Sequence, residues 1–178
     1  MQVQELIVEA MNGNLSRLRE LVANGADVNF VNRRGVTPLM MACQWNRLES
    51  ARFLLDNGAD VDLSERSRGC NALMYACLSG NVQMVKLLLD RGSRVDSTDC
   101  MGRTPLMMAA AIGNGEMVEL LVRAGANIHR KDNIGATAAD LAAGECRGNI
   151  IGLLRANAGV GPGHRMEYYE PGVPEARK

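Results

Sequence analysis

The feature that most constrains this fold is a pattern that recurs about every 33 residues. It reads Gly-Val-Thr-Pro-Leu-Met-Met-Ala in its clearest copy, and its four copies begin at Gly35, Gly69, Gly102 and Gly135. A second marker, Asn-Gly-Ala-Asp-Val or a variant of it, occupies residues 24–28, 57–61, 91–95 and 124–128. Two markers that stay in step over four copies indicate stacked units, none of which can bury its apolar face alone.

Each unit reads as two short helices followed by a polar loop. Thr37-Pro38 predicts a helix start, because threonine can cap free amide groups and proline fits the first helical turn. A turn at Asn46-Arg47 leads to a second helix, whose apolar stripe includes Ala51 and Leu54. Gly58 then ends this helix, since glycine readily takes the left-handed conformation. The polar segment that follows suits a hairpin finger.

These motifs resemble those of the ankyrin repeat family, whose pattern is Gly-x-Thr-Pro-Leu-His-x-Ala-Ala, a second helix, and Leu-Leu-x-x-Gly-Ala-Asp-Val-Asn. The resemblance implies an all-α repeat solenoid of about five stacked repeats, each a helix-turn-helix with a β-hairpin finger. We expect a repeat domain over residues 1–155 and a tail rich in proline and glycine over residues 156–178. The expected repeats are residues 4–31, 32–64, 65–98, 99–131 and 132–155.

The chain departs from the family pattern in two ways. The family's histidine after Thr-Pro-Leu is replaced by Met40, Met74 and Met107, and by Asp140 in the last copy. We expect methionine packing to substitute for the lost Thr–His hydrogen bonds, because methionine fills irregular gaps well. The third unit also has Asn71-Ala72 in place of Thr-Pro, and its finger carries one extra residue within positions 65–68. That finger should be longer than its neighbours or differently shaped.

The resemblance implies that the fingertips and the first helices line a concave face that binds another protein. Carried over to this chain, the face has an apolar line through Trp45, Leu78 and Ile112, rimmed by arginines from the fingers. Tryptophan and arginine are the types most enriched at binding hot spots. The alternative is that the arginines only keep the array soluble and that Trp45 packs against its neighbours. The expected binding residues are Arg33, Arg34, Val36, Gln44, Trp45, Arg66, Arg68, Leu78, Met101, Arg103 and Ile112.

The resulting hypothesis is a small adaptor or a stoichiometric inhibitor whose partner offers an acidic patch with apolar anchors. A bacterial immunity or antitoxin-type protein that neutralises a cognate effector is the alternative within the same class. An enzyme is the rival from another class, but His129 and His164 are the only histidines and neither stands in a nucleophile–base arrangement. We expect no cofactor, and no metal site either, because the sequence has no Cys-x-x-Cys pair.

Charge and cysteine content bound the remaining possibilities. Lys plus Arg and Asp plus Glu each number 20, and this balance argues against broad binding to nucleic acid or to an anionic membrane. No stretch approaches about 18 uninterrupted apolar residues, and the first residues do not resemble a secretory signal. Five cysteines at low density fit a reducing compartment. The expected location is therefore the cytoplasm.

A few residues leave more than one interpretation open. Cys43 and Cys77 occupy equivalent positions, where a small core residue is favoured over a metal or redox pair. Cys70 and Cys100 lie in neighbouring fingers, and a regulatory disulfide between them is conceivable. Asn29 resembles the finger asparagines that asparaginyl hydroxylases modify in this family. The tail could be disordered, could dock a partner, or could fold back over the last repeat, which is the version that its two tyrosines favour.

Overall fold

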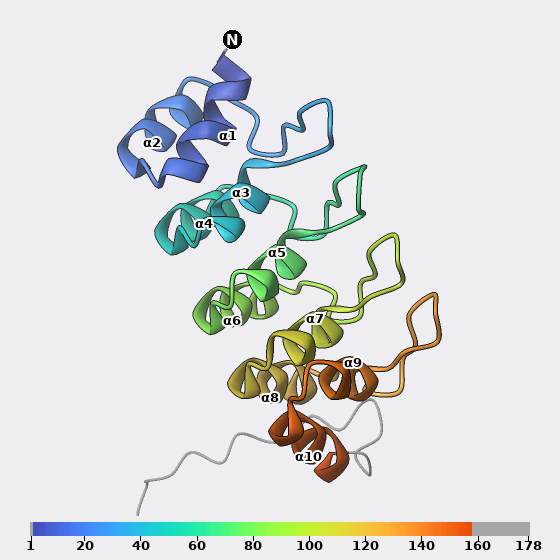
Figure 1. Cartoon of the computed structure of the whole chain (residues 1–178). Coiled ribbons are helices and arrows are strands. Elements are labelled where there is room, and N and C mark those ends of the chain that lie inside the picture. The colour runs from blue at the N-terminus through green and yellow to red at the C-terminus, as the bar shows by residue number, and fades with distance from the viewer. Residues whose placement is uncertain (1, 158–178) are drawn as a thin grey trace, which may run out of the picture.

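A computed structural model of the chain describes residues 2–157, which form ten helices stacked as five pairs (Figure 1). The pairs are α1 (Gln2–Asn12) with α2 (Leu15–Ala23), α3 (Pro38–Gln44) with α4 (Leu48–Asp56), α5 (Ala72–Leu78) with α6 (Val82–Asp90), α7 (Pro105–Ile112) with α8 (Gly115–Arg123), and α9 (Ala138–Gly144) with α10 (Gly148–Ala156). The all-α repeat solenoid expected from the sequence is confirmed. The expectations for the tail at residues 158–178 lie outside the described residues.

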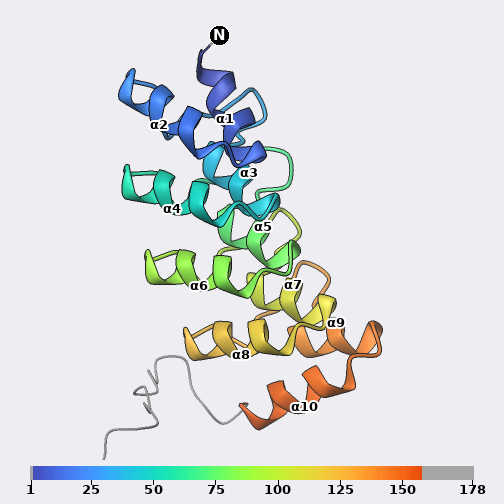
Figure 2. The same cartoon turned by 90° about the vertical axis from the view of Figure 1, so that its left-hand side faces the viewer.

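The stack has two layers of helices and a row of projecting loops. Seen from the side, the first helices of the pairs follow one another in one column and the second helices in another (Figure 2). The loops that join consecutive pairs all project to the same side, as the expected fingers (Figure 1). Because each unit contacts mainly its neighbours, the core is one continuous apolar layer from Leu6 to Leu154.

Capping side chains explain where the first helices begin. The Thr37 hydroxyl oxygen accepts a hydrogen bond from the backbone N–H of Met40 at 3.1 Å, and Thr104 does the same for α7. In the third unit, which lacks Thr-Pro, the Asn71 side chain accepts from the N–H of Met74 at 3.0 Å. Asparagine is as good a cap as threonine, so α5 begins at the equivalent position despite the departure in sequence.

The methionines that replace the family's histidine are fully packed, as expected. Met40, Met74 and Met107 are all buried. The backbone N–H groups of Thr37 and Thr104 also approach the sulfur atoms of Met40 and Met107 at 3.5 and 3.4 Å, and such a thioether accepts hydrogen bonds weakly. Methionine packing therefore replaces most of the family's Thr–His hydrogen bonding, and a weak N–H to sulfur hydrogen bond supplements it.

The last unit uses a carboxylate at this position instead. The Asp140 carboxylate accepts hydrogen bonds from the backbone N–H of Thr137 at 2.8 Å and from its hydroxyl at 2.7 Å. The backbone bond, followed by the hydroxyl bond, lowers the pKa of the Asp140 carboxyl group. This reciprocal cap lies on the surface, so α9 begins at an exposed ionic group, whereas α3 and α7 begin at a buried methionine sulfur.

Small residues let the first helices approach each other closely. Ala42, Ala76, Ala109 and Ala142 are completely buried at equivalent positions. Cys43 and Cys77 are completely buried beside them, and burial raises the pKa of both thiols well above the ordinary cysteine value. A thiol held protonated in this way is a poor nucleophile and a poor metal ligand. The geometry supports the small-core-residue interpretation of this pair.

The turn between the two helices of a pair needs a left-handed backbone. Gly13, Gly80 and Gly113 supply it with φ of 80°, 75° and 84°. Asn46 and Cys146 take the same place in the second and fifth units with φ of 61° and 57°, and they are the only non-glycine residues with positive φ among residues 2–157. Within this range, no helix is long and apolar enough to span a membrane.

Candidate functional site

Each fingertip is closed around one anchoring side chain at its base. In the second unit, the Asn32 side-chain oxygen accepts hydrogen bonds from the backbone N–H groups of Arg34 and Val36 at 2.9 and 3.1 Å. Asp99 and Asp132 make the equivalent pairs of bonds in the fourth and fifth units. The backbone N–H of each anchor donates to the carbonyl four residues later, which closes the turn. The fold of the tip therefore depends on the anchor.

The third finger is longer by one residue, as expected from its sequence. Its anchor is Glu65, whose backbone N–H donates to the carbonyl of Cys70, five residues later, at 3.0 Å. The carboxylate reaches across the wider turn and accepts from the N–H groups of Ser67 and Arg68, each at 2.7 Å. Burial raises the pKa of Glu65, but the hydrogen bond from the Ser67 hydroxyl, together with those from the backbone N–H groups of Ser67 and Arg68, outweighs it and the net shift is downward. The longer side chain thus compensates for the longer loop.

Backbone hydrogen bonds join each fingertip to the next. The N–H of Arg66 donates to the carbonyl of Arg34 at 2.8 Å, and the N–H of Cys100 donates to the carbonyl of Arg68 at 2.7 Å. The fifth finger is linked to the fourth in the same way, from Asn133 to Met101 at 2.9 Å. The tips are consequently held at a fixed spacing before anything binds to them.

The apolar line expected from the sequence is exposed at the ends of consecutive first helices. Trp45 follows the last residue of α3, while Leu78 and Ile112 are the last residues of α5 and α7. Their side chains are 52%, 45% and 38% exposed, so Trp45 is not packed away among its neighbours. Leu78 lies one position before the place that Trp45 and Ile112 share in the repeat. Single exposed apolar residues are ordinary, but exposed apolar residues near the ends of three consecutive first helices indicate a contact surface.

The fingers present two different kinds of arginine. Arg103 pairs with the buried Asp99 carboxylate through Nε at 2.8 Å and through Nη2 at 2.7 Å. Arg68 lies over the Tyr75 ring, 5.8 Å from its centroid, and donates to the Tyr75 hydroxyl at 3.3 Å. Both side chains are thus held by the fold.

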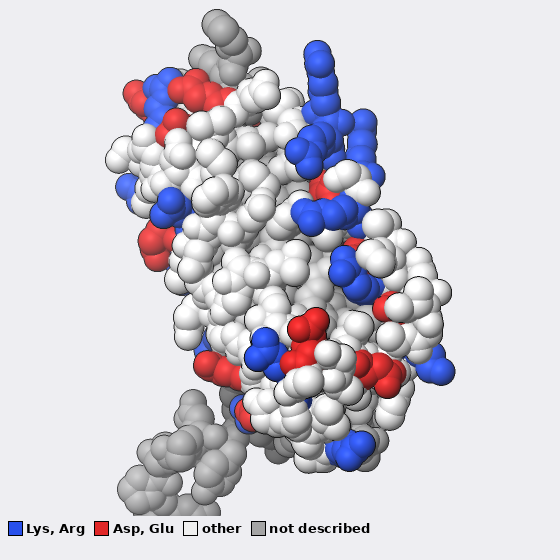
Figure 3. Space-filling model, in the orientation of Figure 1, with Lys and Arg blue, Asp and Glu red and all other residues white. Residues whose placement is uncertain are grey.

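The other three finger arginines are exposed and have no such internal partner. Arg33, Arg34 and Arg66 form no ion pair with any acidic residue in the described part of the chain. Figure 3 shows basic side chains gathered over the fingers toward the N-terminal end of the stack, beside a broad uncharged surface over the helices. We call Arg33, Arg34 and Arg66 the free arginine triad.

Other expected site residues divide between the surface and the core. Gln44 is exposed beside Trp45, and Met101 is 49% exposed at the fourth fingertip. Val36, by contrast, is only 7% exposed, so the expectation that the finger presents it is wrong. Cys70, its counterpart in the third unit, is buried as well. Each follows the turn glycine directly and points inward beneath the finger before the helix cap.

Two residues that shape this surface are not among the expected binding residues. Ile134, at the fifth fingertip, is 82% exposed and extends the apolar surface beyond Met101. Tyr75 is buried beneath Arg68, and it fixes that arginine in a way that the spacing of the repeats does not reveal. The signal for Ile134 was available, since it follows the anchor Asp132 by two residues, as Arg34 follows Asn32.

The structure also bears on the two candidate modification sites. Burial is the main cause that raises the pKa of the Cys70 thiol, which disfavours its reaction with the exposed Cys100. The Asn29 amide group bridges to the next unit: it donates to the Gly58 carbonyl at 3.0 Å and accepts from the Asp60 N–H at 2.7 Å. A hydroxylase would have to break these bonds to use Asn29 as a substrate.

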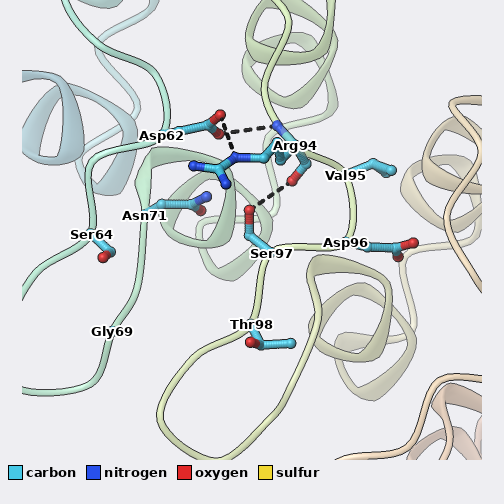
Figure 4. A pocket seen from close by; sticks show the side chains of 9 residues that line it. All are labelled: Asp62, Ser64, Gly69, Asn71, Arg94, Val95, Asp96, Ser97 and Thr98. Carbon is cyan, nitrogen blue, oxygen red and sulfur yellow. Dashed lines mark hydrogen bonds and ion pairs between the residues drawn. The ribbon is translucent and has the colours of Figure 1, made fainter.

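A polar hollow of about 610 Å³ lies between the third and fourth fingers (Figure 4). Arg94 and Asp62 line it and pair with each other, at 2.9 Å between Nε and Oδ2. Ser97 in the same hollow donates to the Arg94 carbonyl at 2.9 Å. No group of three or more potential metal ligands occurs among residues 2–157. The hollow thus has paired polar walls, with no nucleophile and base directed at one another.

Comparison with known proteins agrees with this geometry. A family model for ankyrin repeats in three copies matches residues 6–99, and a single-repeat model matches residues 101–133. The chain is 40% identical over 63 residues to an Arf-GAP with coiled-coil, ANK repeat and PH domains of Gallus gallus, and 38% identical over 60 residues to the DNA-binding protein RFXANK of Homo sapiens. These matches cover 34% and 33% of this chain.

A third relative is a putative ankyrin repeat protein of Fowlpox virus, 39% identical over 46 residues, or 26% of this chain. The chain spans 8%, 23% and 6% of the Arf-GAP, the DNA-binding protein and the viral protein, so only their repeat segments are compared. The family models together cover most of the stack that the structure describes. The chain therefore belongs to the ankyrin repeat family, whose repeats generally mediate protein–protein interaction.

Proposed function

We propose that this protein is a small adaptor or stoichiometric inhibitor that occupies the surface of a partner protein with its concave face. The observation that carries the proposal is the exposed row of Trp45, Leu78 and Ile112 along the ends of α3, α5 and α7. Exposed apolar side chains cost free energy in water, and burying them against a partner recovers it. A row that crosses three units gives the partner a continuous apolar contact.

Rigid presentation is the proposed mechanism. The finger ladder, with bonds such as that from Arg66 to Arg34, fixes the tips relative to one another. The anchors Asn32 and Glu65 fix the shape within individual tips. A surface that is ordered before binding loses little conformational entropy when the partner arrives, which favours affinity.

The proposed partner surface is acidic and carries one or two apolar anchors. The free arginine triad supports this, because guanidinium groups without an internal partner are available for bidentate contacts with carboxylates. Such charges accelerate association and select among partners more than they add affinity. The apolar row then supplies most of the binding free energy.

The test compares affinity purification with wild type, Trp45→Ala and Arg52→Ala as baits, followed by mass spectrometry. Arg52 is exposed on α4, away from the concave face, and provides the matched control. We expect partners to be retained by Arg52→Ala and lost by Trp45→Ala, while thermal unfolding of both variants stays close to wild type. Equal recovery of the same partners by Trp45→Ala would contradict the proposed surface.

The same experiment separates the two roles. If the recovered partner is one enzyme, its activity is titrated with purified protein, and an end point at a one-to-one ratio supports the inhibitor. If several unrelated partners are recovered through Trp45, the adaptor is supported. If partners are bound or inhibited through a surface other than the row of Trp45, Leu78 and Ile112, both the inhibitor and the adaptor role are contradicted.

A further inference from the structure

The chemistry of the fingertips changes along the stack. The second tip carries Arg33 and Arg34, and the third carries Arg66 in its wider turn. The fourth and fifth tips carry the exposed Met101 and Ile134 at the place that Arg34 has in the second tip. The row of tips is thus basic toward the N-terminal end of the stack and apolar toward the other end.

Only part of the finger charge is available to a ligand. The Arg103 guanidinium is neutralised by Asp99, whose carboxylate is completely buried, and Arg68 is held against Tyr75. Arg103 therefore adds little net charge to the fourth finger. Between an anchor and its turn glycine, arginines without an ion pair are found only in the free arginine triad, on two adjacent fingertips that the 2.8 Å bond from Arg66 to Arg34 holds side by side. Arg130 and Lys131 are also exposed without an ion pair, but they precede the anchor Asp132 at the base of the fifth finger.

The helix side of the face does not change in this way. It is apolar in the second, third and fourth units, at Trp45, Leu78 and Ile112. A ligand along the face therefore meets cations and apolar groups together over the second and third units. Over the fourth unit it meets apolar groups from both sides, from Ile112 and from Met101. Over the fifth unit it meets Ile134 at the fingertip, while α9 presents the exposed Asp140 and is followed by the exposed Glu145.

We propose that the occupant of this face is an extended protein segment with carboxylates at one end and aliphatic side chains at the other. Its acidic end lies over the free arginine triad, and its aliphatic end lies between Ile112 and the fourth and fifth fingertips. The inference rests on the proposed function, since it assigns chemistry to the partner of that same face. Both the charge and the apolar surface of the face are complementary to such a segment.

The distribution of charge favours a protein segment over other anionic ligands. A nucleic-acid strand needs cations that follow its phosphates along the whole groove, whereas here the fourth and fifth fingertips carry Met101 and Ile134 in place of cations. Anionic membranes are bound by clusters of about four to eight basic residues, which exceeds the three in the triad. A short acidic stretch that continues into aliphatic residues matches the whole length of the face.

The test is selection from a random twelve-residue peptide library displayed on phage, with immobilised protein as the target. Five baits are used in parallel, of which four are wild type, the triple variant Arg33→Glu, Arg34→Glu and Arg66→Glu, the variant Trp45→Ala, and the control Arg52→Glu. A neutral triple variant with glutamines in place of the same arginines separates lost attraction from added repulsion. Circular dichroism melts confirm that every bait is folded.

We expect wild type and Arg52→Glu to enrich peptides with aspartate or glutamate on one side and leucine, isoleucine or methionine on the other. The charge-reversed triple variant should lose the acidic preference and keep the aliphatic one. A synthetic peptide from the wild-type selection should bind the triple variant about tenfold or more weakly. Its affinity for wild type should fall with added salt, while its affinity for the neutral variant should hardly change.

The outcomes separate this inference from the proposed function. Enriched peptides that depend on Trp45 but show no acidic preference overturn the inference and leave the proposed function standing. If wild type enriches no peptide, or if Trp45→Ala enriches the same peptides as wild type, both the inference and the proposed function are contradicted. A parallel experiment measures whether the protein sediments with vesicles of phosphatidylcholine and phosphatidylserine. If sedimentation of the protein depends on the triad and the peptide selection yields no acidic peptides, the inference is also overturned.

Discussion

The turn between α9 and α10 holds Cys146 in a backbone conformation that three other units assign to glycine. Its φ is 57°, and its side chain is exposed, so the residue gains no burial in return. Its backbone N–H donates to the Ala143 carbonyl at 3.1 Å, a bond that glycine would keep. Replacing Cys146 with glycine should therefore relieve strain without removing a contact.

The magnitude follows from two opposing terms. A residue with a Cβ atom in the left-handed region costs roughly 1–2 kcal/mol relative to its preferred conformation. Glycine in turn lowers the free energy of unfolding by about 0.4–1 kcal/mol, because it increases the conformational entropy of the unfolded chain. The net expectation for Cys146→Gly is a gain of about 0.5–1 kcal/mol in the free energy of unfolding. For a chain of this size, that corresponds to about 1–4 °C in the unfolding temperature.

Asn46 provides the matched control at the same turn of the second unit. Asparagine tolerates the left-handed region better than most residues, and the Asn46 side-chain oxygen accepts a hydrogen bond from Asn81. Asn46→Gly should therefore be neutral or destabilising. Urea unfolding measures both variants, and hydrogen exchange of the α9 and α10 amides locates the gain in the last unit. A stabilisation by Asn46→Gly equal to that of Cys146→Gly would refute the reasoning.

Two further predictions concern side chains that hold the fingers and join the units. Glu65→Gln should lower the free energy of unfolding at pH 7 by about 1–3 kcal/mol, because the amide cannot accept from Ser67 and Arg68 as the carboxylate does. The folded pKa of Glu65 is lowered, so its stabilisation is present above the ordinary glutamate value and is lost as the pH falls through the folded value. The deficit measured by urea unfolding should shrink at pH 3, and an unchanged deficit there would contradict the assignment. Asn29→Ala should cost about 1–2 kcal/mol, because it leaves the Gly58 carbonyl without its inter-unit donor; wild-type stability in a thermal melt would count against this.

Most of the fold could be predicted because its determinants are local. The caps at Thr37 and Thr104, the spacing of the small core residues and the left-handed turns each act within a few residues. The extra residue of the third finger was visible as a longer step between markers. Its solution was also local, because Glu65 spans the wider turn.

The site could be predicted only in outline, because its chemistry depends on contacts between side chains. The exposure of Trp45, Leu78 and Ile112 followed from their places near the ends of three first helices, although Leu78 lies one register position before the other two. The burial of Val36 did not, because the repeat register identifies a finger position without showing that the backbone after Gly35 directs its side chain inward. The sequence also could not separate Arg103 from Arg66, because one finds a buried carboxylate and the other does not.

The fingertip anchors have a consequence for how this surface can evolve. The shape of a tip is set by the anchor at its base, such as Asn32 or Asp99, and by the turn glycine that follows. The residues between them, including Arg34 and Met101, contribute their side chains to solvent, and replacing them costs the fold little. Binding preference can therefore change one repeat at a time, by single substitutions that leave the inherited framework and its stability intact.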